Sequence, residues 1–501
     1  MTISTSSALE KVARHSAMYS LVPLLSRGLS FAMLGVYTWK LHQEENGVIG
    51  VLDMLIIGLQ QLLGYNLLSG LTRLYFEQQD ERARARLVAS TTLLLACLST
   101  VVCSTVYLFR AQLAPLLLGS PGEHVTADTL TTVLGMTLMI VPLQLTSLCG
   151  FQWLQIQQRS GTYALIQLAK TVVELAFKIW FLVGRGYGLE GYLGGVLIGE
   201  GLTALSLGGW MLYRVGLAFD WQRLRPVIAF SLPLVPVGLC QLGIHQLDRR
   251  LLESFDGHAQ VGLYDIGYKL AQVPNLLLLG PFIQIWQPFV FSIRDPRERA
   301  RVVAEISTYA VLVIGAAVIV LVLAGRELVS LIDYSKGRDY AEAALLIPWV
   351  ASGYVLWAVY NTSQIPLLVE NRTGRLMLLN LFGLAVNIGS NLVLIPIHGA
   401  LGAAISTAIT FAALAAGGMQ FARSIAGTHF ELRRILAVLV CVALAAGCAL
   451  WSAGGHALLR MAALSVILCV LGLVVVRAEE RAAFGAWVRA RLGSQRPRGS
   501  P

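Results

Sequence analysis

The chain has 501 residues, of which 56% are hydrophobic and only 13% are charged, and its mean hydropathy is +0.67. Charged residues normally make up about a quarter of a chain, so this composition excludes a soluble globular protein, a disordered protein and a disulfide-rich scaffold. The formal net charge of +10 could suggest nucleic acid as a partner, but Lys and Arg are spread in small groups along the chain, and we predict no nucleic-acid binding.

Apolar stretches long enough to cross a bilayer follow one another along the chain. A transmembrane helix needs about 20 apolar residues, and we therefore predict an all-α integral membrane protein with about 14 transmembrane helices. In chain order these helices cover residues 15–37, 48–72, 87–109, 129–151, 162–183, 188–213, 226–247, 261–291, 302–324, 341–364, 374–395, 399–422, 434–452 and 457–476.

Basic residues are concentrated in the N-terminal segment, in every second connection after it and in the tail at 477–498. The positive-inside rule then places both termini in the cytoplasm of a multi-pass cell-membrane protein, at the inner membrane if the source is Gram-negative. The predicted connections are too short to form domains of their own. The seven cysteines fall in apolar stretches, so we expect neither a disulfide framework nor a metal site, and no cofactor.

A weak internal repeat appears at an offset of about 212 residues. Because each copy contains an even number of predicted helices, the copies would be related by a pseudo-twofold axis along the membrane normal. We predict a six-helix lobe at 1–215, a second six-helix lobe at 216–425, and two additional helices with a basic tail at 426–501. The matching segments are GVLD at 50–53 with GLYD at 262–265, RSG at 159–161 with RTG at 372–374, and GLEG at 188–191 with GALG at 399–402.

Polar residues form stripes at helical spacing inside several predicted helices, where one charge costs about 2.5–3.5 kcal/mol to insert. For any single residue, polar contacts that hold helices together are as good an explanation as function. The set as a whole favours a water-filled cavity between the lobes. The predicted cavity cations are Arg27, Lys170, Lys178 and Lys269, and the other binding or coupling candidates are Asp53, Glu174, His245, Asp248, Asp265, Gln272, Asn380, Asn387 and Asn391.

The repeat also predicts an asymmetric cavity, with charged residues in one lobe where the other has amides. Such a cavity suits a large amphiphile with one charged end. Prolines in the seventh and eighth predicted helices interrupt the helical hydrogen bonds, and these two helices are candidates for a moving gate. The aligned pairs are Gln167 with Asn380, Glu174 with Asn387 and Lys178 with Asn391, and the prolines are Pro233, Pro236, Pro274, Pro281 and Pro288.

Three segments carry a resemblance to a known family: SLPLVPVGLCQLGIHQLDRRLL at 231–252, VGLYDIGYKLAQVP at 261–274 and LIPIHGALGAAISTAIT at 394–410. In these segments the chain resembles the Wzx-type oligosaccharide flippases of the MOP superfamily, whose relatives include lipid II flippases and MATE drug exporters. The resemblance implies transfer of a polyprenyl-pyrophosphate-linked oligosaccharide to the outer leaflet for surface polysaccharide biosynthesis. It also implies that the four cavity cations meet the pyrophosphate, and Lys269 lies inside the matched YKLA pattern.

Two other functions stay open. A MATE-like drug/cation antiporter would prefer an acidic cavity, against which the four cations argue, and a membrane-embedded glycan polymerase or ligase would need a sizeable external loop. The sequence has no Gly-Lys dipeptide and so no phosphate-binding loop for ATP. We therefore predict a transporter and not an enzyme. Its expected partners are a lipid-linked oligosaccharide, membrane lipids, a coupling ion (H+ or Na+) and other membrane proteins of polysaccharide assembly.

Overall fold

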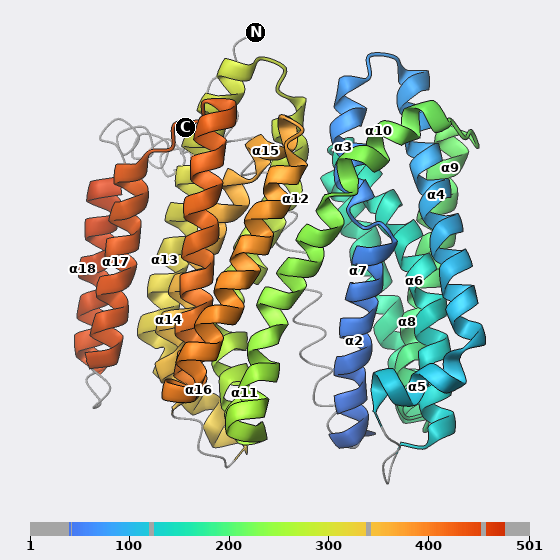
Figure 1. Cartoon of the computed structure of the whole chain (residues 1–501). Helices are drawn as coiled ribbons and strands as arrows, with labels where there is room; N and C mark the ends of the chain where they lie inside the picture. The colour runs from blue at the N-terminus through green and yellow to red at the C-terminus, as the bar shows by residue number, and fades with distance from the viewer. Residues whose placement is uncertain (1–39, 42, 120–124, 337–341, 452–456, 476–501) are drawn as a thin grey trace, which may run out of the picture. The chain divides into compact units, whose positions relative to one another are not determined.

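The computed structural model describes residues 40–41, 43–119, 125–336, 342–451 and 457–475. Over these ranges the chain forms helices and no strand, which confirms the predicted all-α membrane fold (Figure 1). The first predicted helix with Arg27, and the basic tail, lie outside the described residues.

The chain divides into two compact units. The helices α11 (Leu234–Ala271), α13 (Pro296–Lys336) and α16 (Thr373–Ala426) contribute segments to both. The lobes predicted from the repeat have different boundaries and stay a prediction. The first unit comprises Met1–His245, Gly280–Arg299 and Ile365–Leu384, and the second comprises Gln246–Leu279, Ala300–Gln364 and Ala385–Pro501.

The first unit is built around α6 (Ala127–Ile156), which packs against α2, α4, α5 and α8 (Figure 1). Helix α6 is apolar on nearly every side, and a helix of this kind is stable only when it is buried by its neighbours. The other elements that begin in this unit are α2 (Gln43–Leu63), α3 (Leu67–Glu77), α4 (Glu81–Leu108), α5 (Arg110–Leu118), α7 (Ser160–Ile179), the π-helical turn η1 (Trp180–Gly184), α8 (Leu189–Thr203), η2 (Ala204–Gly208), α9 (Gly209–Val215), α10 (Trp221–Ser231), α11, α12 (Gly280–Ser292), α13, α15 (Ile365–Val369) and α16.

Several helix starts follow from local sequence. The side chains of Asp80, Thr126 and Asp220 accept hydrogen bonds from backbone N–H groups in the first turns of α4, α6 and α10, at 3.2 Å in each case. Such caps satisfy N–H groups that have no partner within the helix.

The second unit contains η3 (Asn275–Leu279), α14 (Ala343–Ser363), α17 (Leu432–Trp451) and α18 (Ala457–Val475), with the larger parts of α11, α13 and α16. Helix α17 packs against α14 and α18. Helix α16 is two helices joined at Gly399, whose φ of 54° and ψ of −132° are not helical. This break falls between the predicted spans 374–395 and 399–422.

One turn occurs twice, 213 residues apart. Gln158 and Asn371, each with φ of 56°, are the non-glycine residues with positive φ in the described chain. The next residues, Arg159 and Arg372, donate backbone hydrogen bonds to the carbonyls of Leu154 and Leu367, which are separated by the same offset. Helices α7 and α16 then begin at equivalent positions. The repeated turn supports the internal repeat seen in the sequence.

Eight helices of the described chain are long and apolar enough to cross a membrane, or ten if two bent pairs each form one span. One bent pair joins Gln260–Ala271 to Asn275–Ser292 at 44°, beside Pro274. The predicted connection between the seventh and eighth spans lies within α11, and the chain reverses direction there, because Arg249 and Asp265, which would be about 24 Å apart along a straight helix, form an ion pair at 2.6 Å. Helix α5 lies in the predicted connection between the spans 87–109 and 129–151. The number fourteen stays a prediction.

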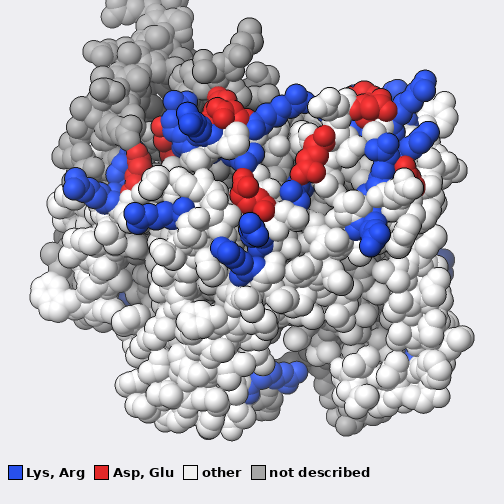
Figure 2. All heavy atoms as spheres, turned by 45° about the horizontal axis from the view of Figure 1, so that its top comes forward, with Lys and Arg blue, Asp and Glu red and all other residues white. Residues whose placement is uncertain are grey.

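Charged side chains are unevenly distributed on the surface. Figure 2 shows them gathered in a band at the helix ends that are uppermost in Figure 1, above a largely uncharged surface. A surface without charge is what the hydrocarbon core of a bilayer requires, because an exposed charge there would lose its hydration. The protein is a multi-pass membrane protein.

Candidate functional site

The first unit contains a pocket of about 300 Å³ bordered by α3, α6, α7 and α12. Its polar lining consists mainly of carboxamide side chains. The lining residues are Tyr65, Leu68, Ser69, Gln144, Ser147, Leu148, Phe151, Gln152, Gln155, Tyr163, Gln167, Lys170, Ile283, Gln284, Gln287 and Pro288. We call this site the glutamine pocket.

Helical spacing places these groups on one face of each helix. On α6, Gln144, Phe151 and Gln155 follow one another at intervals of seven and four residues, and on α7 Tyr163, Gln167 and Lys170 follow at four and three. Residues at these intervals lie on the same side of an α-helix. The pocket therefore lies where the polar faces of these otherwise apolar helices meet.

Part of the lining is held by hydrogen bonds between helices. The Gln152 amide donates to Thr72 Oγ1 at 2.7 Å, and the Tyr163 hydroxyl donates to Gln284 Oε1 at 3.3 Å. These bonds connect α6 with α3 and α7 with α12. They fix the orientation of side chains that would otherwise rotate freely.

Gln287 has a different environment. Its Nε2 atom is buried, and no described residue accepts a hydrogen bond from it. A buried amide donor without an acceptor is unfavourable by about 1–3 kcal/mol. Because Gln287 lines the glutamine pocket, an acceptor within that pocket would remove this penalty.

Ionised side chains lie beside the pocket. The Lys170 ammonium is 2.6 Å from Glu200 Oε1 and 3.8 Å from Glu174 Oε1. Ser147 donates to the second oxygen of Glu200, which is only 1% exposed. A buried charge must be paired in this way, because it has lost its hydration.

Two more predicted residues belong to this charged region of the first unit. Lys178 is 7% exposed, and its Nζ atom lies 4.3 Å from the ring centroid of Tyr192. Asp53 on α2 is exposed and interacts electrostatically with Lys178. With Glu174 and Glu200, the carboxylates outnumber the two lysines.

The predicted residues in the second unit form a separate network. The Tyr264 hydroxyl donates to Asp248, which is completely buried. Arg249 lies 2.6 Å from Asp265 Oδ1 and contacts the ring of Tyr268. These contacts connect turns of α11, and Lys269 is exposed near its end, before Gln272.

The three predicted asparagines all lie on α16 and are fully buried. In the second unit, the Asn387 amide donates to Thr410 Oγ1 at 3.2 Å and so connects the two halves of α16, and Asn391 donates to Asn387. In the first unit, Asn380 bonds to the Leu376 carbonyl and accepts from Gln241. His245 is also in this unit.

The structure thus brings Lys170, Glu174 and Lys178 together with Asp53, and Asp248 with Asp265. It also reveals residues that were not among the predicted ones. Glu200 could have been found as a carboxylate inside an apolar helix, and the α6 glutamines as a stripe at helical spacing. Nothing in the sequence links Gln284 or Gln287 to this pocket. The described residues include no group of three or more His, Cys, Asp or Glu side chains that could hold a metal ion.

Solved structures with the same architecture define the fold. A MOP superfamily transporter from Pyrococcus furiosus, described as having a binding pocket of reverse polarity, shares 16% identity at a TM-score of 0.71 over 85% of this chain and 96% of its own. An outward-facing multidrug resistance MATE family transporter shares 14% identity at a TM-score of 0.71, over 85% of this chain and 96% of its own. A mutant of a Vibrio cholerae MATE transporter shares 15% identity at a TM-score of 0.67, over 84% of this chain and 98% of its own. The fold is that of MOP superfamily transporters.

The sequence family is more specific than the fold. The chain belongs to the polysaccharide biosynthesis protein family, whose sequence model matches residues 41–342. No curated protein matches the chain significantly. The family and the fold together confirm the resemblance to MOP superfamily proteins of polysaccharide biosynthesis.

Proposed function

We propose that the protein is a flippase that moves a polyprenyl-pyrophosphate-linked oligosaccharide from the cytoplasmic to the outer leaflet by alternating access. The polysaccharide biosynthesis family supports the class of substrate, and the MOP fold supports transport. In this proposal the repeats at 1–215 and 216–425 are the moving lobes, both termini are cytoplasmic, and the protein is not an enzyme.

The composition of the glutamine pocket carries the proposal. A carboxamide can both donate and accept hydrogen bonds, as can each hydroxyl of a sugar. Gln287 Nε2 has no acceptor among the residues that the structure describes, and a sugar hydroxyl or ring oxygen would provide one. Tyr65 and Tyr163 add aromatic rings to the same lining. Neutral groups of this kind suit an oligosaccharide better than they suit a lipophilic cation.

Lys170 offers a connection between the pyrophosphate and a coupling ion. It is the cation among the described lining residues, and its ammonium is held by Glu200 at 2.6 Å. A pyrophosphate would have to compete with this carboxylate. A coupling ion bound at Glu200 would offset the competing charge and leave Lys170 able to bind phosphate oxygens. Either H+ or Na+ could act in this way, so both stay proposed coupling ions.

The test is restoration of surface polysaccharide in a strain that lacks its own copy of the gene. We expect Gln287→Leu and Gln284→Leu to reduce surface glycan by about tenfold, because each removes a hydrogen bond to the sugar. Gln112→Leu, on the exposed surface of α5, is the matched control and should export normally. Normal export by both pocket variants, at normal abundance in the membrane, would reject the role of the pocket.

A MATE-like cation antiporter is the second candidate, and one observation favours it. Asp53, Glu174 and Glu200 outnumber Lys170 and Lys178 in the first unit, so this region is acidic. The discriminating measurement is efflux of a fluorescent lipophilic cation from a drug-sensitive host. Efflux that is abolished by Glu200→Gln, together with normal surface glycan in the deletion strain, would place antiport ahead of flipping.

A further inference from the structure

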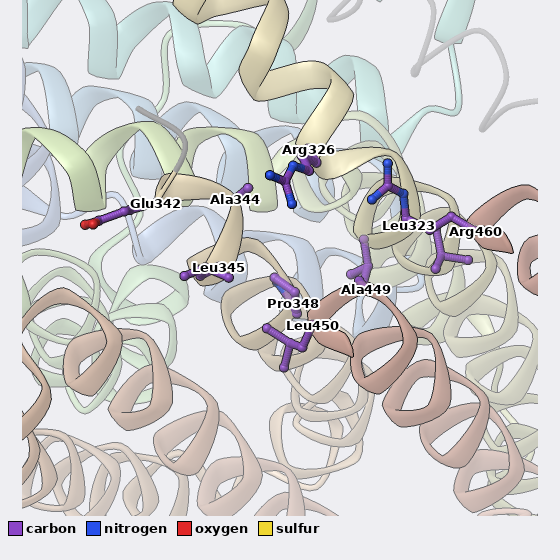
Figure 3. Close-up of a pocket in the computed structure, with 10 residues that line it drawn as sticks. Leu323, Arg326, Glu342, Ala344, Leu345, Pro348, Ala449, Leu450 and Arg460 are labelled. Carbon is purple, nitrogen blue, oxygen red and sulfur yellow. The ribbon is translucent and has the colours of Figure 1, made fainter. Parts of the chain in front are cut away.

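The second unit contains a pocket of about 230 Å³ where α13 and α14 meet the last two described helices, α17 and α18. Figure 3 shows side chains from these helices around it. The lining residues are Val322, Leu323, Arg326, Glu342, Ala344, Leu345, Pro348, Ala449, Leu450 and Arg460. We call it the arginine pocket, and it is separate from the glutamine pocket of the first unit.

The length of α13 places this pocket at a membrane boundary. Arg301 and Arg326 lie on the same helix and are 25 residues apart, a distance of about 37 Å at 1.5 Å per residue. The hydrocarbon core of a bilayer is about 30 Å thick. Residues between the two arginines are almost all apolar. The arginine-rich start of α13 and the arginine pocket therefore lie at opposite surfaces of the bilayer.

Two arginines supply positive charge to the pocket. Arg326 is exposed, whereas Arg460 is only 6% exposed and forms an ion pair with Glu327. In Figure 3, Glu342 lies at the other end of the pocket and points away from Arg326. The charged residues that line the pocket are Arg326, Arg460 and Glu342, so the lining carries one net positive charge, and Glu327, which is not among the lining residues, pairs with Arg460. A phosphodiester carries one negative charge.

The remaining walls are apolar, and the surrounding surface is suited to lipid chains. Leu323, Leu345 and Leu450 line the pocket. Trp451, at the end of α17, is 80% exposed, and Met461 on α18 is 66% exposed. Exposed tryptophan is typical of the interface between headgroups and hydrocarbon. The pocket therefore has positive charge at its opening and apolar walls at the depth of the lipid headgroups. These properties are complementary to a phospholipid, which has a charged headgroup and apolar chains.

We infer that the arginine pocket binds the phosphodiester headgroup of an anionic phospholipid, with Arg326 and Arg460 as donors to the phosphate oxygens. Arginine forms strong, charge-assisted hydrogen bonds with phosphate, and its guanidinium carries five N–H donors. The bound lipid fixes α17 and α18 against α13 and α14. This inference does not rest on the proposed transport activity, since it concerns retention of a membrane lipid.

The test is lipid retention by the purified full-length protein, measured by native mass spectrometry and by thermal unfolding. Phosphatidylglycerol should bind and raise the melting temperature, and phosphatidylcholine with the same acyl chains should do so much less. Arg326→Gln should weaken phosphatidylglycerol binding about tenfold, as expected for the loss of a hydrogen bond to a charged group. Ala449→Phe, which fills the apolar wall and keeps both arginines, should weaken binding as well.

Arg185→Gln is the matched control, since Arg185 is an exposed arginine in the first unit, outside the pocket, on the same predicted membrane side. It should retain phosphatidylglycerol like the unchanged protein. Equal losses in Arg185→Gln and Arg326→Gln would overturn the site. Equal stabilisation by millimolar inorganic phosphate, unaffected by Ala449→Phe, would overturn the lipid as the ligand. Neither lipid binding nor the melting temperature measures transport, so a negative result here would not count against the flippase proposal.

Discussion

The ion pair between Lys170 and Glu200 is a contact between two nearly buried charges on different helices. We expect Glu200→Gln to lower the melting temperature of the purified protein in detergent, because the Lys170 ammonium then keeps only Glu174 at 3.8 Å. Removing one partner of a buried pair in a protein destabilises it by about 3–5 kcal/mol. Ser147 can still donate to the new amide oxygen, so the loss should arise from the charge.

A double variant separates charge pairing from packing. Lys170→Met alone should also lower the melting temperature, because Glu200 is left as a buried carboxylate. Lys170→Met with Glu200→Gln removes both charges, and its loss should be smaller than the two single losses added together. Strictly additive losses would show that the two side chains do not stabilise one another.

At the scale of single residues, the helical spacing of polar side chains predicted the α7 part of this site but not its partner on α8. The spacing of Gln167, Lys170 and Glu174 places them on one face of α7, which the sequence alone establishes. Their partner Glu200 lies on another helix, 30 residues further along the chain. Which face of α8 meets α7 depends on close packing, and an isolated helix pattern does not contain that information. The same reason hid Gln284 and Gln287.

At the scale of elements, Gly195 and Gly199 lie where α8 approaches α7. A Cβ at Gly195 would lie 2.8 Å from the backbone nitrogen of Lys178 and 3.1 Å from the Glu174 carbonyl oxygen. The backbone cannot give way as a side chain can. We expect Gly195→Ala to separate the helices and to destabilise the protein by about 1–3 kcal/mol, measured as a fall in melting temperature.

Gly209→Ala is the control for the change of residue type. Gly209 is in helical conformation, and no atom lies within 4 Å of a Cβ built there. Alanine is a better helix former than glycine by about 1 kcal/mol, so this variant should be as stable as the parent or more stable. A loss in Gly209→Ala as large as that in Gly195→Ala would remove the argument from close packing.

The repeated turn before α7 and α16 gives a second prediction at this scale. Gln158 has a positive φ, a conformation that costs residues other than glycine about 1–2 kcal/mol and that asparagine tolerates better. We expect Gln158→Gly to raise the melting temperature more than Asn371→Gly does. A larger gain at Asn371 would mean that the strain at Gln158 is relieved by its surroundings.

Hydropathy and charge located most helices and two of the breaks within them. The predicted boundary near residue 399 coincides with the bend at Gly399, because a proline and two glycines mark it in the sequence. The charged residues after Asp248 also mark a break between predicted spans, and the ion pair between Arg249 and Asp265, 16 residues apart, shows that the chain reverses direction there within α11. Charged residues collect at such a reversal because it lies at the membrane boundary.

At the scale of the whole molecule, composition was sufficient for the fold class and the resemblance for the family. The offset of the internal repeat is supported by the paired turns at Gln158 and Asn371. The boundaries of the proposed moving lobes do not follow from one structure, because the alternating access that we propose requires more than one arrangement of the two halves. One sequence has to be compatible with each of these arrangements, so it does not predict which of them a given structure shows.

The distribution of basic residues makes a prediction about the orientation of the whole chain. Cysteines introduced at Gln79 and His429, which are exposed between helices, should be protected from a membrane-impermeant maleimide in intact cells and labelled in lysed cells. Cysteines at Asp128 and Glu342 should be labelled in both, because these residues lie at the starts of the predicted spans 129–151 and 341–364, on the side opposite to Gln79 and His429. The parent protein, whose own thiols all lie within apolar helices, is the control for background labelling. The opposite pattern at all four positions would invert the topology and would place the arginine pocket at the cytoplasmic surface.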